Sequence, residues 1–239
     1  MKLDILALSA HPDDAELGCG GTLIRHVKSG LKVGVVDFTA GELGTRGTAA
    51  DRSAEAAASA KIMGLSVREN LGLPDGFFGS SEDHVKRVVT AIRKYRPEIL
   101  LANAPEDRHP DHPKGADVAH SAWFLAGLVK LKTTDASGNE QEPWRPRVLY
   151  HYIQSQFLKP DFVIDISEQW EQKMMAIKAF KTQFFDPSSK EPVTYISTPE
   201  FLRMLESRAL ELGHALGVKY GEGFVTRRWI GVRSLTDLI

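Results

Sequence analysis

The stretch LALSAHPDDAELG, residues 6–18, decides how the rest of the sequence is interpreted. An apolar run of strand length ends at His11 and Pro12, and two aspartates and then a glutamate follow. Negative charge at the end of a buried strand costs free energy unless a positive group lies close to it. These carboxylates therefore need a positive partner, whose nature the rest of the sequence must indicate.

The first half of the chain alternates short apolar runs with longer amphipathic ones. Runs of strand length cover 3–10, 32–40, 67–73 and 98–104, and runs with helical spacing cover 20–30, 51–64 and 83–97. Strands that alternate with helices pair in parallel and are covered by helices on both faces. We therefore expect a Rossmann-like three-layer α/β/α sandwich with a mostly parallel sheet, whose ligand site lies beyond the carboxyl ends of the strands.

The second half is less regular. We expect helices over 113–130, 167–184 and 199–217, with Ser167 as the N-cap of the second, and strands over 147–153, 161–167 and 222–225. The polar segments 132–146 and 186–197 are typical of loops. No linker-like segment interrupts the chain, so residues 1–239 are expected to form a single domain.

Charge and composition argue against several classes of partner. The net charge is −1, the pI is about 6.7 and no block of like charges occurs, so we expect no nucleic-acid partner. No stretch reaches the roughly 20 apolar residues that span a bilayer. The N-terminal apolar run also lacks the features of a signal peptide, so we expect no membrane association and a cytoplasmic location. The single cysteine, Cys19, suits a reducing compartment and is expected to be a small buried residue.

A second cluster of histidines and acids, PEDRHPDHPKGA at 105–116, follows the fourth predicted strand. It supplies His109, Asp111 and His112. Because the carboxyl ends of neighbouring parallel strands meet at one edge of a sheet, these side chains should approach the first cluster.

The two clusters together favour a metal site. His11 and Asp14 are three residues apart and can converge on one point if a helix starts near Pro12. Two imidazoles and one carboxylate with an open fourth position form a common catalytic zinc arrangement, which would answer the need for a cation. The remaining acids, Asp13 and Asp111, suit a general base and an orienting carboxylate. Aspartates at a helix start are also favoured as caps, so either cluster alone is weak evidence.

At these residues the sequence resembles the PIG-L/LmbE family of zinc-dependent deacetylases that act on N-acetylglucosamine derivatives. The paired motif is HPDD at 11–14 and HPDH at 109–112. The segments GELGTRGT (41–48), KPDFVIDISE (159–168) and YGEGF (220–224) resemble the branch that deacetylates N-acetylglucosaminyl-malate in bacillithiol biosynthesis. The resemblance implies removal of an N-acetyl group from such a conjugate by a homo-oligomer, such as a hexamer.

The resemblance also implies roles for individual residues. The residues that it places on Zn²⁺ are His11, Asp14 and His112. Fe²⁺ can occupy the same ligands in the cell. The resemblance makes Asp13 the general base, and His109, backed by Asp111, the charged histidine that stabilises the oxyanion or protonates the leaving amine.

Substrate contacts are expected mainly from arginines, because malate carries two carboxylates and a guanidinium fork binds a carboxylate in a bidentate way. Arg52 matches the substrate-binding arginine of the family. Arg46 and Arg147 are further candidates, and Tyr195 could add an oxyanion or sugar contact. Glu16 could support the metal ligands from outside.

Other interpretations of the same residues remain open. GCGGT at 18–22 follows a strand, but the third position of a dinucleotide-binding fingerprint is Leu23, so these glycines are expected to allow close packing of the first helix. Two histidines and a carboxylate also bind ferrous iron in oxygenases, which would give Asp13 no task. A non-catalytic metal site would normally be closed by four protein ligands. Another N-acyl sugar conjugate, cleaved by a deacetylase or amidase, is the nearer alternative.

Overall fold

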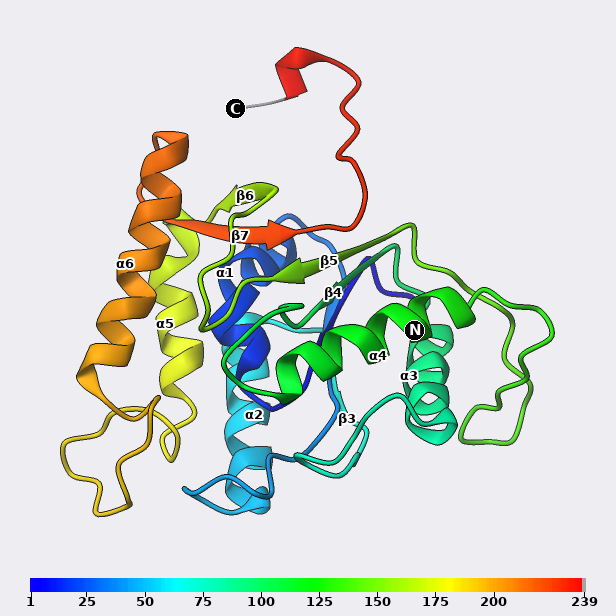
Figure 1. Cartoon of the computed structure of the whole chain (residues 1–239), viewed down its shortest axis with the longest axis horizontal. Helices are drawn as coiled ribbons and strands as arrows, with labels where there is room; N and C mark the ends of the chain where they lie inside the picture. The colour runs from blue at the N-terminus through cyan, green and yellow to red at the C-terminus, as the bar shows by residue number, and fades with distance from the viewer. Residues whose placement is uncertain (238–239) are drawn as a thin grey trace.

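A computed structural model describes residues 1–237 and shows a seven-stranded sheet in the order β3-β2-β1-β4-β5-β7-β6 (Figure 1). The strands are β1 Ile5–Ser9, β2 Val33–Asp37, β3 Val67–Asn70, β4 Ile99–Ala102, β5 Val148–Tyr152, β6 Phe162–Asp165 and β7 Gly221–Val225. The first five strands in this order pair in parallel, and β7 is antiparallel to both β5 and β6. The predicted α/β fold with a mostly parallel sheet is confirmed.

Helices cover both faces of the sheet (Figure 1). The helices are α1 Asp14–Lys28, α2 Ala49–Met63, α3 Glu82–Tyr95, α4 Asp111–Leu125, α5 Trp170–Lys178 and α6 Pro199–Leu216, with short 3-10 turns at Ser167–Gln169 and Leu235–Asp237. α3 and α4 pack together on one face, while α1, α2 and α5 lie on the other. α6 packs against β7 and extends the second layer with a third apolar cluster.

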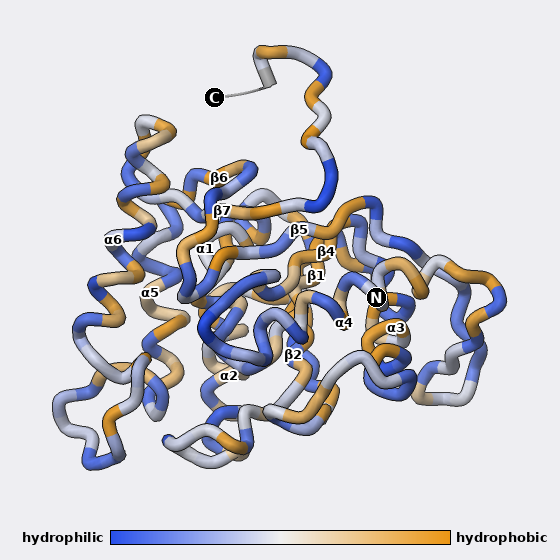
Figure 2. The backbone as a smooth tube through the Cα atoms, in the orientation of Figure 1, coloured by the Kyte–Doolittle hydropathy of each residue, from blue (hydrophilic) through white to orange (hydrophobic). Residues whose placement is uncertain are grey.

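The central strands are apolar on both faces because helices cover both. Every residue of β1 and β2 is buried, and the hydropathy colouring of Figure 2 shows apolar residues concentrated along the central strands. Such continuous apolar runs are the pattern expected of buried parallel strands. The sheet is therefore a rigid platform whose carboxyl edge can carry polar loops.

Two predictions in the second half are wrong. The helix expected over 167–184 is a 3-10 turn followed by α5, which ends at Lys178. Ser167 is not its N-cap, because the Ser167 hydroxyl accepts hydrogen bonds from the backbone N–H groups of Lys219 and Tyr220. A long-range contact thus replaces the local cap that the sequence pattern indicated.

The first helix is interrupted at Cys19, which is buried and has non-helical backbone angles of φ −144° and ψ 16°. The break leaves new N–H groups without helical partners, and the Glu222 carboxylate on β7 accepts them from Gly21 and Thr22 at 2.9 and 2.7 Å. Lys173 of α5 donates to the same carboxylate at 2.6 Å. The last strand therefore holds the first helix in place.

The C-terminal segment leaves the body of the molecule. After β7 the chain runs outward in an extended conformation, which leaves Trp229 96% exposed (Figure 1). Among residues 1–237, the helices are all too short or too polar to cross a lipid bilayer.

The glycines of α1 allow close packing, as expected from the sequence. A Cβ on Gly18 would lie 2.2 Å from Cδ2 of Tyr152, a fully buried ring on β5 whose hydroxyl donates to the Leu8 carbonyl. A Cβ on Gly21 would meet Ile166 at 2.8 Å.

We therefore expect Gly18→Ala to lower the free energy of unfolding by about 1–3 kcal/mol, because the Tyr152 ring must shift within a packed core. Urea unfolding followed by circular dichroism measures this loss. Gly79→Ala is the matched control, since a Cβ there meets open space and its stability should match the wild type. Equal stability of both variants would contradict the packing role of Gly18.

Candidate active site

A cavity of about 540 Å³ lies at the carboxyl ends of β1 and β4, where the sequence placed the ligand site. Its floor carries both predicted clusters. Its walls come from loops 43–46, 75–76, 153–155 and 194–196 and from the inner face of α6. A cavity of this size fits a drug-sized ligand, larger than a single acetyl group.

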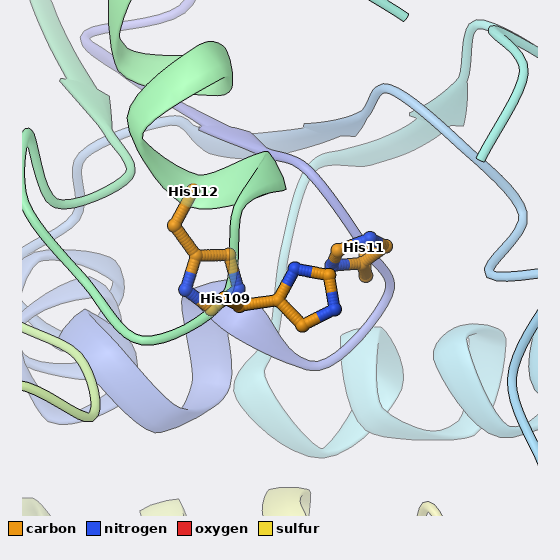
Figure 3. Close-up of side chains that lie close together, drawn as sticks. All are labelled: His11, His109 and His112. Atoms are coloured by element: carbon orange, nitrogen blue, oxygen red, sulfur yellow. The ribbon is translucent and has the colours of Figure 1, made fainter. Parts of the chain in front are cut away.

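The side chains of His11 and His112 meet on either side of Asp14. Nδ1 of His11 lies 3.6 Å from Oδ2 of Asp14, and Nε2 of His112 lies 3.0 Å from Oδ1. Figure 3 shows the imidazoles of His11, His109 and His112 gathered where the loop after β1 meets the start of α4. The structure thus brings the predicted metal-binding residues together.

Each of these two histidines has its other ring nitrogen held by carboxylates. Nε2 of His11 lies 3.1 Å from Asp75 and 3.2 Å from Asp111, and Nδ1 of His112 contacts Asp107. A carboxylate on the outer nitrogen fixes the tautomer and aims the inner nitrogen, as in most protein metal sites. The sequence pattern did not indicate Asp75 or Asp107 as partners of the histidines, although Asp107 lies within the second cluster at 105–116.

Polar side chains also fix Asp14. Asn103 donates to its Oδ2 at 2.9 Å and Gln154 donates to its Oδ1 at 3.0 Å. The two amides are joined, since Asn103 also donates to the Gln154 carbonyl oxygen at 3.0 Å. Asp14 is therefore held in one orientation, with an oxygen directed at His112.

The residues fit a divalent metal in chemistry as well as geometry. Burial disfavours charge on His112, yet Asp14 and Asp107 outweigh it and raise its pKa to about 9. The pKa of His11 is also raised, because Asp111, Asp14 and Asp75 outweigh burial. The carboxylates around these two histidines therefore favour positive charge at the site. Among the described residues, the groups close enough to share a metal are His11–His109–His112 and His11–Asp75–Asp111, and Asp14 contacts two members of the first.

Asp13 lies beside this cluster in an unusual backbone conformation. Its φ of 121° is rarely adopted by residues other than glycine, so the backbone is strained where the first cluster turns into α1. Burial raises the pKa of Asp13 to about 7, although Arg52 opposes the shift. A buried carboxylate that titrates near neutrality is suited to general-base catalysis.

One expectation about the second cluster is wrong, the pairing of Asp111 with His109. The carboxylate of Asp111 contacts His11, Lys114 and the backbone N–H of Gly76, and it does not pair with His109. Burial lowers the pKa of His109, and the neighbouring His11 and His112 lower it further, whereas Asp14 and Asp111 oppose the shift. His109 still lines the cavity, next to the ring of His11.

The four expected substrate contacts fall in different places. Arg52 lines the cavity but is already bonded to Asp13 at 3.2 Å and to the Pro12 carbonyl. Arg46 lines it and is buried, and Tyr195 lines it with 46% of its surface exposed. The expectation for Arg147 is wrong, because this residue is exposed at the amino end of β5, the opposite edge of the sheet.

Glu16 was expected to support the metal ligands, but its hydrogen-bond partners lie elsewhere. Its carboxylate accepts from Ser59 at 2.6 Å and from Arg68 at 2.5 Å. Arg68 also bonds to Asp37 of β2 at 2.8 Å. Glu16 therefore ties α1 to α2 and to the sheet under the site.

Comparisons with known proteins agree with this arrangement. Residues 6–123 match the family model PIG-L, described as GlcNAc-PI de-N-acetylase. The chain is 30% identical to the diacetylchitobiose deacetylase of Thermococcus kodakarensis, over 92% of this chain and 81% of that protein. It resembles the crystal structure of the conserved protein TT1542 from Thermus thermophilus at 35% identity, with a TM-score of 0.85 over 97% of this chain and 98% of that one.

The chain therefore belongs to the PIG-L family of N-acetylglucosamine deacetylases. A second relative, the 4-oxalmesaconate hydratase of Pseudomonas putida, is 28% identical over 74% of this chain and 73% of that protein. Because relatives carry names of two reaction types, the reaction of this chain must be argued from its own residues.

The carboxylate behind His112 gives a test of the metal site. We expect Asp107→Asn to weaken Zn²⁺ binding about 10–100-fold, because His112 loses the partner that orients it. Competition with a chromogenic chelator measures the dissociation constant, and circular dichroism checks the fold. Asp117→Asn, an exposed aspartate on the same α4, should bind Zn²⁺ like the wild type. Unchanged affinity in Asp107→Asn would show that Asp107 does not support a metal ligand.

Proposed function

We propose that the protein is a metal-dependent hydrolase that removes the N-acetyl group from an N-acetylglucosamine conjugate, with malate as the aglycone. The observation that carries the proposal is the meeting of His11, Asp14 and His112 beside the strained, buried Asp13 in one cavity. Hydrolysis uses each of these groups, whereas an oxygenase would give Asp13 no task. The family membership supports the same reaction.

The proposed ligands of the metal are Nδ1 of His11, the carboxylate of Asp14 and Nε2 of His112. A divalent metal bound there supplies a water molecule of lowered pKa and polarises the acetyl carbonyl. Zn²⁺ is the proposed ion, and Fe²⁺ fits the same donors.

The remaining residues divide the proton transfers between them. Asp13 accepts a proton from the attacking water as the new C–O bond forms. It returns that proton to the nitrogen as the amide C–N bond breaks, which leaves acetate and the free amine. His109, next to His11, donates a hydrogen bond to the carbonyl oxygen as its negative charge grows. Arg52 holds Asp13 in place through its ion pair.

The choice of malate rests on sequence segments outside the metal motif and on the cations of the cavity. Arg46, Arg108 and Arg208 line it in addition to Arg52. Guanidinium groups bind carboxylates in a bidentate way, which suits a dicarboxylate aglycone. The related diacetylchitobiose deacetylase is named for a neutral substrate, so substrate charge separates the alternatives.

The test is acetate release from N-acetylglucosaminyl-malate, diacetylchitobiose and free N-acetylglucosamine by zinc-loaded, iron-loaded and chelator-treated protein. We expect metal-dependent release that is fastest with the malate conjugate, because the bound metal activates the water. Faster release from diacetylchitobiose would overturn the choice of malate and keep the reaction. No acetate from any of the three by metal-loaded protein would overturn the deacetylase proposal and favour hydration or oxygen chemistry.

Asp13→Asn tests the proposed base. Asparagine keeps the shape and tolerates the positive φ better than alanine does, so the variant should stay folded and bind metal. We expect its kcat to fall about 10²–10⁴-fold, because the amide cannot accept a proton from water. Metal content and circular dichroism serve as controls. A folded, metal-loaded Asp13→Asn with wild-type turnover would rule out Asp13 as the base.

A further inference from the structure

Arg46 is a buried cation without an ion-pair partner among residues 1–237. It is 4% exposed, and no described carboxylate lies within 4.0 Å of its guanidinium. One hydrogen bond joins its Nη2 to the exposed Ser189 hydroxyl at 2.6 Å, and its Nε is buried without any partner among the described residues. Burying an uncompensated charge costs several kcal/mol. The guanidinium of Arg46 therefore needs a negative partner, which the described residues do not supply.

The other cations of the cavity are paired with carboxylates or are less buried than Arg46. Arg52 pairs with Asp13, and Lys173 pairs with Glu222 at 2.6 Å. Arg108 is exposed and stacks over the Tyr195 ring at 4.1 Å, and Arg208 donates to the Ser155 carbonyl at 2.7 Å. Arg46 is thus the buried cation of this cavity whose charge the described residues leave unpaired.

The nearest acidic groups on the neighbouring loop do not fill this role. The pKa of Asp186 is lowered mainly by hydrogen bonds from Ser188 and only slightly by Arg46, and this carboxylate is exposed. Glu191 accepts from the backbone N–H of Gly47. Both acids are therefore exposed to solvent, and neither forms an ion pair with Arg46 within 4.0 Å.

The backbone around Arg46 is held firmly. Its carbonyl accepts from Gln183 at 2.7 Å, and the next residue, Gly47, has a φ of +67° and lies against Thr182. A further buried polar atom without a described partner, the hydroxyl of Thr194, belongs to the lining of the same cavity. A preorganised guanidinium and an unsatisfied hydroxyl that line one cavity are suited to the recognition of an anion.

We propose that Arg46 is the specificity-determining residue of the cavity and binds the anionic group of the substrate's aglycone, a carboxylate or a phosphate. The proposal rests on the deacetylase function proposed above for the same cavity. Arg52 then serves to position Asp13, and the task that the sequence assigned to Arg52 falls to Arg46. Because Arg46 contacts the aglycone and not the acetyl group, its loss affects binding rather than the chemical step.

The experiment compares Arg46→Gln, Arg46→Lys and Lys190→Gln with the wild type, each loaded with Zn²⁺. Lys190→Gln removes the same unit of charge from the adjacent exposed loop and does not line the cavity, so it controls for long-range electrostatics. The substrates are N-acetylglucosaminyl-malate, N-acetylglucosamine 1-phosphate and the neutral methyl glycoside, which separate carboxylate from phosphate and from no charge.

We expect Arg46→Gln to raise KM for the preferred anionic substrate about 10–100-fold, the value of a charge-assisted hydrogen bond, with kcat changed less than about twofold. Kinetics with the methyl glycoside should match the wild type. Arg46→Lys should recover part of the loss, and Lys190→Gln should show none. An unchanged anionic-to-neutral preference in Arg46→Gln, or an equal loss with all three substrates, would overturn the proposal.

A binding measurement separates this proposal from the proposed reaction. Malate and inorganic phosphate are titrated calorimetrically into zinc-loaded wild type and Arg46→Gln, without any turnover. Binding of either anion that is lost in Arg46→Gln supports the assignment even if no conjugate releases acetate. Absence of binding to the wild type, or equal binding to both proteins, contradicts it even if acetate is released.

Discussion

The structure depends on the burial of several carboxylates at the carboxyl edge of one sheet. Asp13, Asp14, Asp107 and Asp111 come from the two clusters that follow β1 and β4, and Asp75 comes from the loop after β3. Such a concentration of negative charge is unstable unless cations lie among it. Two histidines and Arg52 provide part of the compensation, and the amides of Asn103 and Gln154 provide part of the rest. The carboxylates still need a further positive charge, which makes the site suitable for a divalent metal.

The sequence predicted the position of this site because the relevant information is local. HPDD and HPDH each follow an apolar run of strand length, and parallel strands bring the ends of neighbouring βα units to one edge. The meeting of His11, Asp14 and His112 follows from this topology without knowledge of any loop. The close packing at the glycines of α1 could be predicted for a similar reason, because a helix that directly follows a strand packs against the sheet.

Partner choice among the polar side chains could not be predicted in the same way. Asp111 lies two residues from His109 yet contacts His11. The guanidinium of Arg52 lines the cavity, but it is bonded to Asp13 and is not free to bind a substrate carboxylate in a bidentate way. Arg147 and Arg46 carry the same charge, but Arg46 lines the cavity at the carboxyl ends of the strands and Arg147 lies at the amino end of β5. These outcomes depend on long-range packing, which short motifs do not encode. The wrong prediction of a cap at Ser167 has the same origin, because its hydroxyl accepts from the backbone of Lys219 and Tyr220, which connect α6 to β7.

The break in α1 makes the first helix depend on Glu222, a residue that is synthesised much later. The N–H group of Gly21 finds its acceptor, Glu222, 201 residues later in the sequence. A loop of that length closes slowly, and during synthesis the acceptor does not exist while the first strands and helices emerge. The helix that begins at Asp14 can therefore reach its final form only after the last strand has been made. The edge of the sheet that carries the site is therefore completed by a residue 201 positions further along the chain.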